Sequence, residues 1–506
     1  MIPPANHSHL RITDFPAFPG KSISMCVTKD CQLRCSYCYL HTKSQDSDMA
    51  PDMAFRIIDT MFDDPWTYLT EVQDDGVKAR GCKPELARYL AFDFIGGEPL
   101  LKTDLIRSLV MRVLQKSVDP KYNFSVRFAI STNGVNYRSD AVQKLVAECG
   151  DVLSVGMTID GTEAQHDSCR VFPDGKGSHH VVEESARLWQ EQFPTHGTKV
   201  TISPENISQL SESMIYLWED IGIQHVPANT VFESGWTDQH AAIFKKQLRI
   251  LKKYLLEGDN AARFHTTLFD ETIGFPLSPD ETTNSCGGNG KMLFWMPDGS
   301  LFNCIRYAPH ATKDGIGLPM GHIERGLDDK VVRRLERINR RTSSDDECFY
   351  CPVASGCSYC PGAQNDFFGD PNIRAKYICE MHKARVEVSK EFFRELGQRF
   401  QRTVPEWVHG SIDIAPYHSK VDLTRLEDEM YRAMQLKVLS VSLPNDTELP
   451  QQTEWILQYA ESRAEIERGY RILCNAAEVS SEEYLLDIAR RLLIPKSVYA
   501  TRAVDL

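Results

Sequence analysis

Three cysteines near the amino terminus have a spacing that suits an iron–sulfur cluster. Cys31, Cys35 and Cys38 stand in the run CQLRCSYCYL, with Tyr37 directly before the third cysteine. A cubane [4Fe–4S] cluster normally takes four cysteine ligands, so a group of three either uses a distant fourth cysteine or leaves one iron open to another ligand. A zinc site or an all-cysteine electron-transfer site is the simpler alternative.

A second motif follows the next expected strand. The run FIGGEPLL contains Gly96, Gly97, Glu98 and Pro99. Two glycines allow the backbone to approach a ligand closely, and a neighbouring carboxylate can accept hydrogen bonds from a cationic amine. By itself such a run is more often a turn, so its meaning depends on its position one β/α unit after the cysteines.

Polar residues also follow the third and fourth expected strands. Ser131 and Asn133 belong to the run STNG, and Asp160 belongs to TIDG, which precedes Arg170 in the run HDSCR. Hydroxyl, amide and guanidinium groups suit the hydroxyls of a ribose and a carboxylate. Each is also an ordinary turn residue, and Asp160 before a glycine is equally well explained as part of a turn.

A second group of cysteines lies between positions 286 and 379: Cys286, Cys304, Cys348, Cys351, Cys357, Cys360 and Cys379. A zinc ribbon needs its two C-x2-C pairs about a dozen or more residues apart. Here the pairs are much closer, since Cys357 follows Cys351 after the short run PVASG. Iron–sulfur clusters are the better interpretation. In bacterial ferredoxins a cysteine followed by proline ligates the other cluster, and Cys360 precedes a proline.

Short apolar segments alternate with amphipathic helical stretches from about residue 21 to residue 232. This alternation predicts an α/β fold of parallel β/α units, and six such units fit a partial (β/α)6 barrel. Functional residues of such barrels gather at the carboxyl ends of the strands, where the cysteines and polar runs stand. The expected strands are 22–27, 90–95, 125–131, 152–159, 198–203 and 225–232, and the expected helices include 52–62, 104–115, 139–148, 181–193, 238–256 and 381–401.

The composition excludes several classes of partner. The chain has 506 residues, a net charge of −13 and no long basic run, which argues against nucleic-acid binding. It has no long apolar stretch and no secretory signal pattern, so we expect a cytoplasmic protein without a membrane partner. Its 15 cysteines then indicate metal or redox chemistry. The cysteines outside the two groups are expected to be buried apolar residues: Cys26, Cys82, Cys149, Cys169 and Cys474.

The combination of CQLRCSYCYL and GGEP resembles the radical S-adenosylmethionine (SAM) enzymes. In that family the three cysteines hold a [4Fe–4S] cluster, and the amino and carboxylate groups of SAM chelate its open iron. The resemblance implies that Cys31, Cys35 and Cys38 hold this cluster and that the GGEP strand end binds the methionine amino group. It further implies SAM contacts from Tyr37, Ser131, Asn133, Asp160 and Arg170.

The second cysteine group and the hairpin run FWMPDGSLFNC resemble the SPASM extension of radical SAM enzymes that modify peptides. The resemblance implies two auxiliary clusters, and therefore three [4Fe–4S] clusters in all. It assigns the outer cluster to Cys348, Cys351, Cys357 and Cys379, and the inner cluster to Cys286, Cys304 and Cys360. Two residues separate Cys357 from Cys360 where the family usually has three, which weakens the assignment of Cys360. The inner cluster, with three thiolates, would have an open iron.

The expected organisation is an extension 1–20, a radical SAM barrel 21–257, a linker 258–283, a SPASM domain 284–380, a closing helix 381–403 and a mainly helical region 404–506. The resemblance is strongest to maturases of ribosomally made peptides (RiPPs) that form thioethers on cysteine-repeat precursors, as in ranthipeptides and sactipeptides. It implies reductive cleavage of SAM to a 5′-deoxyadenosyl radical, removal of a hydrogen from a peptide carbon, and closure of a cysteine thioether.

Other functions remain open at this point. A maturase that forms carbon–carbon (cyclophane-type) links and an anaerobic sulfatase-type formylglycine maturase use the same cofactors. A non-enzymatic iron–sulfur or zinc protein belongs to a different class, and in it the GGEP run would have no role. No catalytic side chain is identified. The implied partners are a precursor peptide with a leader sequence and an electron donor of the flavodoxin or ferredoxin type.

Overall fold

The computed structural model describes residues 20–43, 48–73, 76–79, 88–120, 124–278, 281, 286–290, 292–401, 403–405 and 408. The predicted extension 1–20 and the predicted helical region 404–506 lie almost entirely outside the described residues, as do Cys82 and Cys474. The chain divides into two compact units. Unit 1 contains Met1–Glu271, Gly290–Glu336 and Tyr377–His409, and unit 2 contains Thr272–Asn289, Arg337–Lys376 and Gly410–Leu506. The predicted domain boundaries stay a prediction.

The described part of unit 1 is built on an eight-stranded sheet with the order β12-β11-β10-β9-β1-β4-β5-β6. Its central strands run parallel and are β1 (Lys21–Thr28), β4 (Tyr89–Gly96), β5 (Ser125–Thr132) and β6 (Leu153–Met157). On the other side of β1 lie the parallel strand β9 (Met292–Trp295) and the antiparallel strands β10 (Ser300–Phe302), β11 (Gly321–His322) and β12 (Gly326–Leu327). Two separate pairs are β2 (Thr70–Gln73) with β3 (Gly76–Ala79), and β7 (Val200–Ile202) with β8 (Ala228–Thr230).

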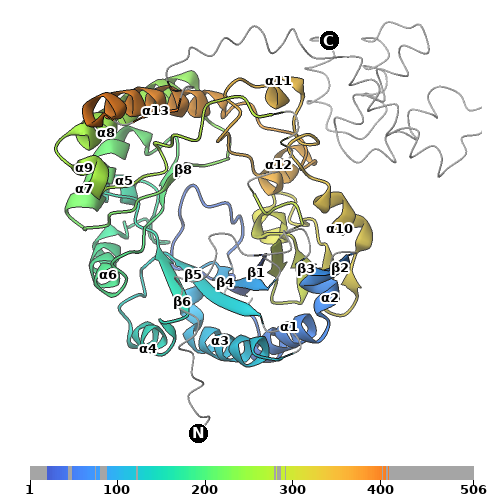
Figure 1. Ribbon diagram of the computed structural model, residues 1–506. Helices are drawn as coiled ribbons and strands as arrows, with labels where there is room; N and C mark the ends of the chain where they lie inside the picture. The colour runs from blue at the N-terminus through green and yellow to red at the C-terminus, as the bar shows by residue number, and fades with distance from the viewer. Residues whose placement is uncertain are drawn as a thin grey trace, which may run out of the picture. The chain divides into compact units, whose positions relative to one another are not determined.

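Helices lie outside the strands, as Figure 1 shows for α1, α3, α4 and α6. The α-helices of unit 1 are α1 (Pro51–Asp63), α2 (Pro65–Tyr68), α3 (Thr103–Ser117), α4 (Asp140–Cys149), α5 (Glu163–Asp167), α6 (His179–Gln192), α7 (Leu210–Glu219), α8 (Asp238–Leu256), α9 (Asn260–Arg263), α10 (Asp329–Glu336) and α13 (Cys379–Phe400). Its 3-10 helices are η3 (Pro99–Lys102), η4 (Ile207–Gln209), η5 (Ile305–Tyr307) and η6 (Pro309–Ala311). Unit 2 contains α11 (Asp346–Phe349) and α12 (Pro361–Phe368).

The core of unit 1 lies between the sheet and these helices. Phe92, Phe94 and Phe128 are fully buried, and the rings of Phe94 and Phe128 stack at 6.0 Å. Each such burial contributes about 2–3 kcal/mol to folding. The alternate residues Asp93 and Arg127 are polar and incompletely buried. Because side chains alternate along a strand, the apolar residues pack under the helices and the polar residues take the inner face of the sheet.

The structure confirms the predicted α/β class and the parallel strands of a partial barrel. The predicted strand 225–232 is shortened to β8, three residues long. Its first half contains Pro227, which has no N–H to donate to a sheet and accepts a bond from Val200 N instead. The prediction also lacks α7 and the β2–β3 hairpin. No helix in the described ranges is long and apolar enough to cross a membrane.

A row of ion pairs joins α8 to α13. Three basic residues of α8 face three acidic residues of α13 with N···O distances from 2.6 to 3.1 Å: Lys245, Arg249 and Lys252 with Glu387, Glu391 and Glu395. Glu391 contacts both Arg249 and Lys252, and the hydrogen bond from Arg249 is the largest cause that lowers its pKa. These pairs connect the helix after the second cysteine group to the barrel.

Replacing Glu391 by Gln should lower the free energy of unfolding by about 1 kcal/mol at low salt and neutral pH, and by less at high salt. The pKa of Glu391 is lower in the folded chain than in the unfolded chain. The contribution is therefore complete above the unfolded pKa of about 4.3 and is lost as the pH falls through the folded pKa. Denaturant unfolding of this variant and of an exposed control, Glu191→Gln, measures the difference. A loss that is independent of salt and pH would contradict the ionic explanation.

Candidate functional site

The cysteine loop, residues 31–38, follows β1 and is held by backbone hydrogen bonds to a segment distant in sequence. Arg34 N donates to Val171 O at 2.7 Å, and Ser36 N donates to Cys169 O at 2.9 Å. The loop is therefore paired with the chain that follows β6 and α5. Its position depends on residues more than 130 positions later in the sequence, so the spacing of the cysteines could not predict it.

Two basic side chains shape the loop from within. Arg34 Nη1 donates to Cys31 O at 2.6 Å and to Leu33 O at 3.0 Å, and Lys43 Nζ donates to Leu33 O at 3.0 Å. Neither residue was expected from the motifs. Both place positive charge beside the thiols, which favours a negatively charged group bound there.

The glycine pair of the GGEP run packs against the backbone that leads into the cysteine loop. A Cβ added at Gly96 would lie 1.9 Å from Thr28 O, and one added at Gly97 would lie 2.0 Å from Asp30 O. Gly97 N donates to Thr28 O at 3.0 Å, and Glu98 N donates to Asp30 O at 2.7 Å. The close approach predicted for the glycines is therefore made to the chain before the cysteines. Backbone hydrogen bonds therefore join the end of β4 to the chain that leads into the cysteine loop.

Glu98 connects this turn to the end of β5. Its Oε1 accepts hydrogen bonds from Leu100 N at 3.0 Å and from Thr132 Oγ1 at 2.7 Å, and its Oε2 accepts from Asn133 N at 2.7 Å. The residue is 1 % exposed, and burial raises its pKa while these three donors lower it. Pro99 is buried and begins η3 directly afterwards. The predicted role of Glu98 toward the SAM amino group stays a prediction.

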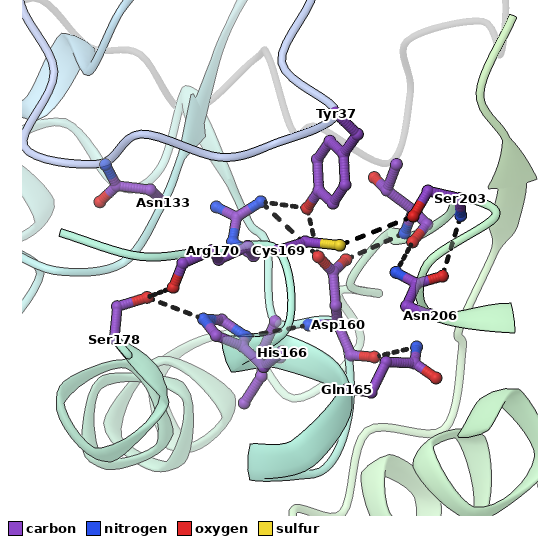
Figure 2. Close-up of polar contacts among 12 residues, drawn as sticks. Tyr37, Asn133, Asp160, Gln165, His166, Cys169, Arg170, Ser178, Ser203 and Asn206 are labelled. Atoms are coloured by element: carbon purple, nitrogen blue, oxygen red, sulfur yellow. Dashed lines mark hydrogen bonds and ion pairs between the residues drawn. The ribbon is translucent and has the colours of Figure 1, made fainter. Parts of the chain in front are cut away.

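Tyr37, Asp160 and Arg170 form a buried network beside the loop (Figure 2). The Tyr37 hydroxyl donates to Asp160 Oδ2, and Arg170 Nη1 donates to Tyr37 Oη at 2.8 Å and lies 3.8 Å from Asp160 Oδ2. Asp160 Oδ1 accepts from Thr201 N at 2.9 Å. Burial raises the pKa of Asp160 and the charge of Arg170 opposes that rise. Three residues predicted separately thus lie together.

His166 and Ser178 form a chain of hydrogen bonds that ends at the backbone carbonyl of Arg170 (Figure 2). His166 Nδ1 accepts from Asp160 N at 3.3 Å, so the ring proton is on Nε2 and is donated to Ser178 Oγ at 3.0 Å. Ser178 Oγ donates in turn to Arg170 O at 2.9 Å. Burial lowers the pKa of His166 well below its usual value, which keeps the ring neutral. The histidine lies in the predicted HDSCR run but was not predicted as a site residue.

The site contains donors that the described residues leave without a partner. They are Arg170 Nε and Gln32 Nε2, and both atoms are buried. Asn133 Nδ2 lies beside them and contacts Gln32 Oε1 at 3.2 Å and Cys31 Sγ at 3.6 Å. Ser131 is exposed at the end of β5. Buried donors normally have partners, so these atoms fit a bound polar molecule such as SAM.

The three thiols of the cysteine loop lie near one another, beside an open hollow. Burial is the largest cause that raises the pKa of Cys35 to about 11, and the charges of Cys38 and Cys31 add to it, so the three thiols are neighbours. Cys31 Sγ accepts from Leu33 N at 3.4 Å. An open hollow of about 450 Å³ is lined by Cys35 and Cys38. Within the described ranges, no three Cys, His, Asp or Glu side chains are arranged to hold one ion. A cubane binds each thiolate at a different iron, so it does not require that arrangement.

The second cysteine group is distributed over both units. Cys304 and Cys379 belong to unit 1, and the others belong to unit 2. Within unit 2, the charges of Cys351 and Arg374 act on Cys357, whose pKa is raised mainly by burial. Cys286 Sγ accepts from Gly288 N at 3.3 Å, and a Cβ added at Gly288 would lie 3.6 Å from Pro361, the residue after Cys360. Cys360 Sγ accepts from Ala363 N at 3.5 Å.

Comparisons with known proteins agree with this geometry. The sequence model of the radical SAM superfamily matches residues 25–217. The chain is 27 % identical over 197 residues to an uncharacterized protein of Methanocaldococcus jannaschii, covering 39 % of this chain and 58 % of that protein. It is 25 % identical over 174 residues to a cysteine-type anaerobic sulfatase-maturating enzyme of Clostridium novyi. That match covers 33 % of this chain and 40 % of the enzyme. The chain thus spans about half the length of these curated relatives.

Solved structures share the fold. The enzyme anSMEcpe with bound AdoMet superimposes with a TM-score of 0.54 at 18 % identity, covering 75 % of this chain and 99 % of that chain. The structure of the same enzyme with AdoMet and Kp18Cys peptide superimposes with a TM-score of 0.53 at 16 % identity, and the coverage of both chains is the same. Residues 25–217, which match the radical SAM superfamily, contain the cysteine loop and the parallel strands β1, β4, β5 and β6. The fold of this chain is that of anSMEcpe, with further residues at the carboxyl terminus.

Replacing Gly97 by Ala should displace the cysteine loop, because the new methyl group would collide with the Asp30 carbonyl. We expect most of the iron and of the SAM affinity to be lost after anaerobic reconstitution. Gly156→Ala is the matched control, since a Cβ there meets its nearest atom, Ile130 O, at an ordinary 3.6 Å. Iron analysis and calorimetric titration with SAM measure the effect. A fully loaded Gly97→Ala protein would contradict the docking of the two motifs.

Proposed function

We propose that the protein is a peptide-modifying radical SAM enzyme. The observation that carries the proposal is the assembly of the cysteine loop, the GGEP turn and the Tyr37–Asp160–Arg170 network around unpartnered buried donors. Cys31, Cys35 and Cys38 would hold the cluster, and Arg170, Gln32 and Asn133 would contact SAM. When bound, the cluster and SAM supply a 5′-deoxyadenosyl radical that removes a hydrogen atom from a peptide carbon. The chain's own residues orient SAM and limit the entry of water.

Peptide substrates are proposed by similarity. The structure of anSMEcpe that resembles this chain contains AdoMet and Kp18Cys peptide, and a curated relative is a cysteine-type anaerobic sulfatase-maturating enzyme. For this chain we propose a precursor peptide, recruited by a leader sequence, and reduction by a flavodoxin-type or ferredoxin-type protein. The described residues do not identify a leader-binding segment.

We further propose two auxiliary clusters held by the second cysteine group. Supporting contacts lie within unit 2, where Cys286 and Cys360 each accept a backbone N–H bond and Cys351 neighbours Cys357. Such N–H···S bonds stabilise the negatively charged sulfur of a cluster ligand. The assignment of Cys304 and Cys379 rests on the family pattern alone.

Replacing Cys35 by Ala should abolish reductive cleavage of SAM, because the loop would lose one of its three thiolate ligands. The assay is anaerobic reconstitution, incubation with SAM and dithionite, and measurement of 5′-deoxyadenosine. The native protein should contain about twelve irons if all three cubanes form and about four if only the first does. Cys149→Ala, at a buried position on α4, is the control and should remain active. Formation of 5′-deoxyadenosine by Cys35→Ala would refute the cluster assignment.

The product distinguishes a thioether from the alternatives. Incubation with a synthetic cysteine-repeat peptide should give a product lighter by two hydrogens with one thiol that no longer reacts with iodoacetamide. A product lighter by two hydrogens with all thiols reactive would indicate a carbon–carbon link. The similarity to the sulfatase-maturating enzyme favours a second candidate, oxidation of cysteine to an aldehyde. Loss of sulfur from Kp18Cys peptide would establish that alternative and exclude the thioether.

A further inference from the structure

Arg306 joins two cysteine-bearing segments of unit 1. Its guanidinium carbon lies 4.0 Å from the centre of the Tyr39 ring, and Tyr39 directly follows Cys38 of the cysteine loop. Arg306 belongs to η5, and Cys304 is the residue directly before that helix. Two segments far apart in the sequence, each carrying a predicted cluster ligand, therefore meet at a contact between a cation and an aromatic ring.

Backbone hydrogen bonds join the same two segments a few residues later. His41 N donates to His310 O at 2.8 Å, and Thr42 N donates to the same carbonyl at 3.4 Å. His310 belongs to η6, which closely follows η5, and it is buried. The contact between Arg306 and Tyr39 is therefore part of a larger packing interface, and the guanidinium has a defined place within it.

Glu233 is the counter-ion of this guanidinium. Arg306 Nη1 lies 2.6 Å from Glu233 Oε1, and the two side chains are only 15 % and 31 % exposed. Glu233 follows the carboxyl end of β8, where functional residues of a barrel gather. Its Oε2 is buried and has no hydrogen-bond partner among the described residues. An ion pair with Glu233 and a ring contact with Tyr39 leave the guanidinium little freedom, because its planar charge is bound at two places.

A fixed positive charge at this place acts on the clusters that the two segments are predicted to hold. A [4Fe–4S] cluster with thiolate ligands is negatively charged, and reduction adds one electron to it. A nearby cation therefore stabilises the reduced form more than the oxidised form and raises the reduction potential. The largely buried position of Arg306 strengthens the effect, because solvent ions screen a buried charge less.

We infer that Arg306 raises the reduction potentials of two clusters, the SAM-binding cluster at Cys38 and the inner auxiliary cluster at Cys304. This inference rests on the proposed function. Arg306 is a positioning residue, since it acts through its charge on the cofactors and forms no bond with the substrate. Glu233 carries the opposite charge and limits the effect.

The test measures the potential of each cluster by redox titration of the anaerobically reconstituted protein, followed by EPR. The signal that changes when SAM is added belongs to the SAM-binding cluster. We expect Arg306→Gln to lower the ratio of reduced to oxidised cluster about tenfold at a given potential, a shift of about 59 mV for one electron. Arg306→Lys should keep most of the native potential, and Glu233→Gln should raise it. Arg187→Gln, which breaks the ion pair with Glu183 at 2.7 Å on α6, should leave it unchanged.

Shifts of opposite sign in Arg306→Gln and Glu233→Gln distinguish an effect of charge from a disturbed fold. Unchanged potentials in Arg306→Gln, shifts of the same sign in the two variants, or a shift of only one of the two signals would overturn the inference. If Arg306→Gln does not retain its iron, Glu233→Gln decides, since a raised potential supports the inference and an unchanged one overturns it. Failure of the proposed function has a different signature. In that case the wild-type protein would produce no 5′-deoxyadenosine from SAM and dithionite, whatever the potentials show.

Discussion

The site depends on the docking of the cysteine loop against the strand end that follows β4. The loop has few hydrogen bonds of its own, so neighbouring strands must supply its backbone partners. Thr28 and Asp30 accept bonds from the GGEP turn, and Arg34 and Ser36 donate to the chain after β6. Any side chain on the two glycines would block this contact. The close approach of backbone to backbone therefore fixes the thiols before a cofactor binds.

Buried carboxylates extend this constraint across the sheet. Glu98 joins the turn to the end of β5, and Asp160 joins the loop, through Tyr37, to β7. Each carboxylate is surrounded by donors, because a buried charge without partners is costly. Both residues are 1 % exposed or less. The polar groups at successive strand ends thus hold one another in place, while the remaining donors point to a ligand.

The alternation of side chains explains how one sheet serves both stability and chemistry. Apolar residues such as Phe92 and Phe128 pack under the outer helices and provide the core. Polar residues such as Asp93 and Arg127 take the inner face.

The sequence by itself determined the α/β class and the parallel strands, and it supplied the candidate site residues as predictions, because cysteine spacing, glycine pairs and apolar periodicity are local properties. It did not reveal that the glycines contact the backbone leading into the cysteine loop, or that His166 is linked through Ser178 to Arg170. The strand predicted at 225–232 is also longer than the observed β8, because Pro227 interrupts the strand pairing. Those features depend on contacts between residues far apart in the chain, and only the tertiary structure decides which polar groups meet and which remain for a ligand.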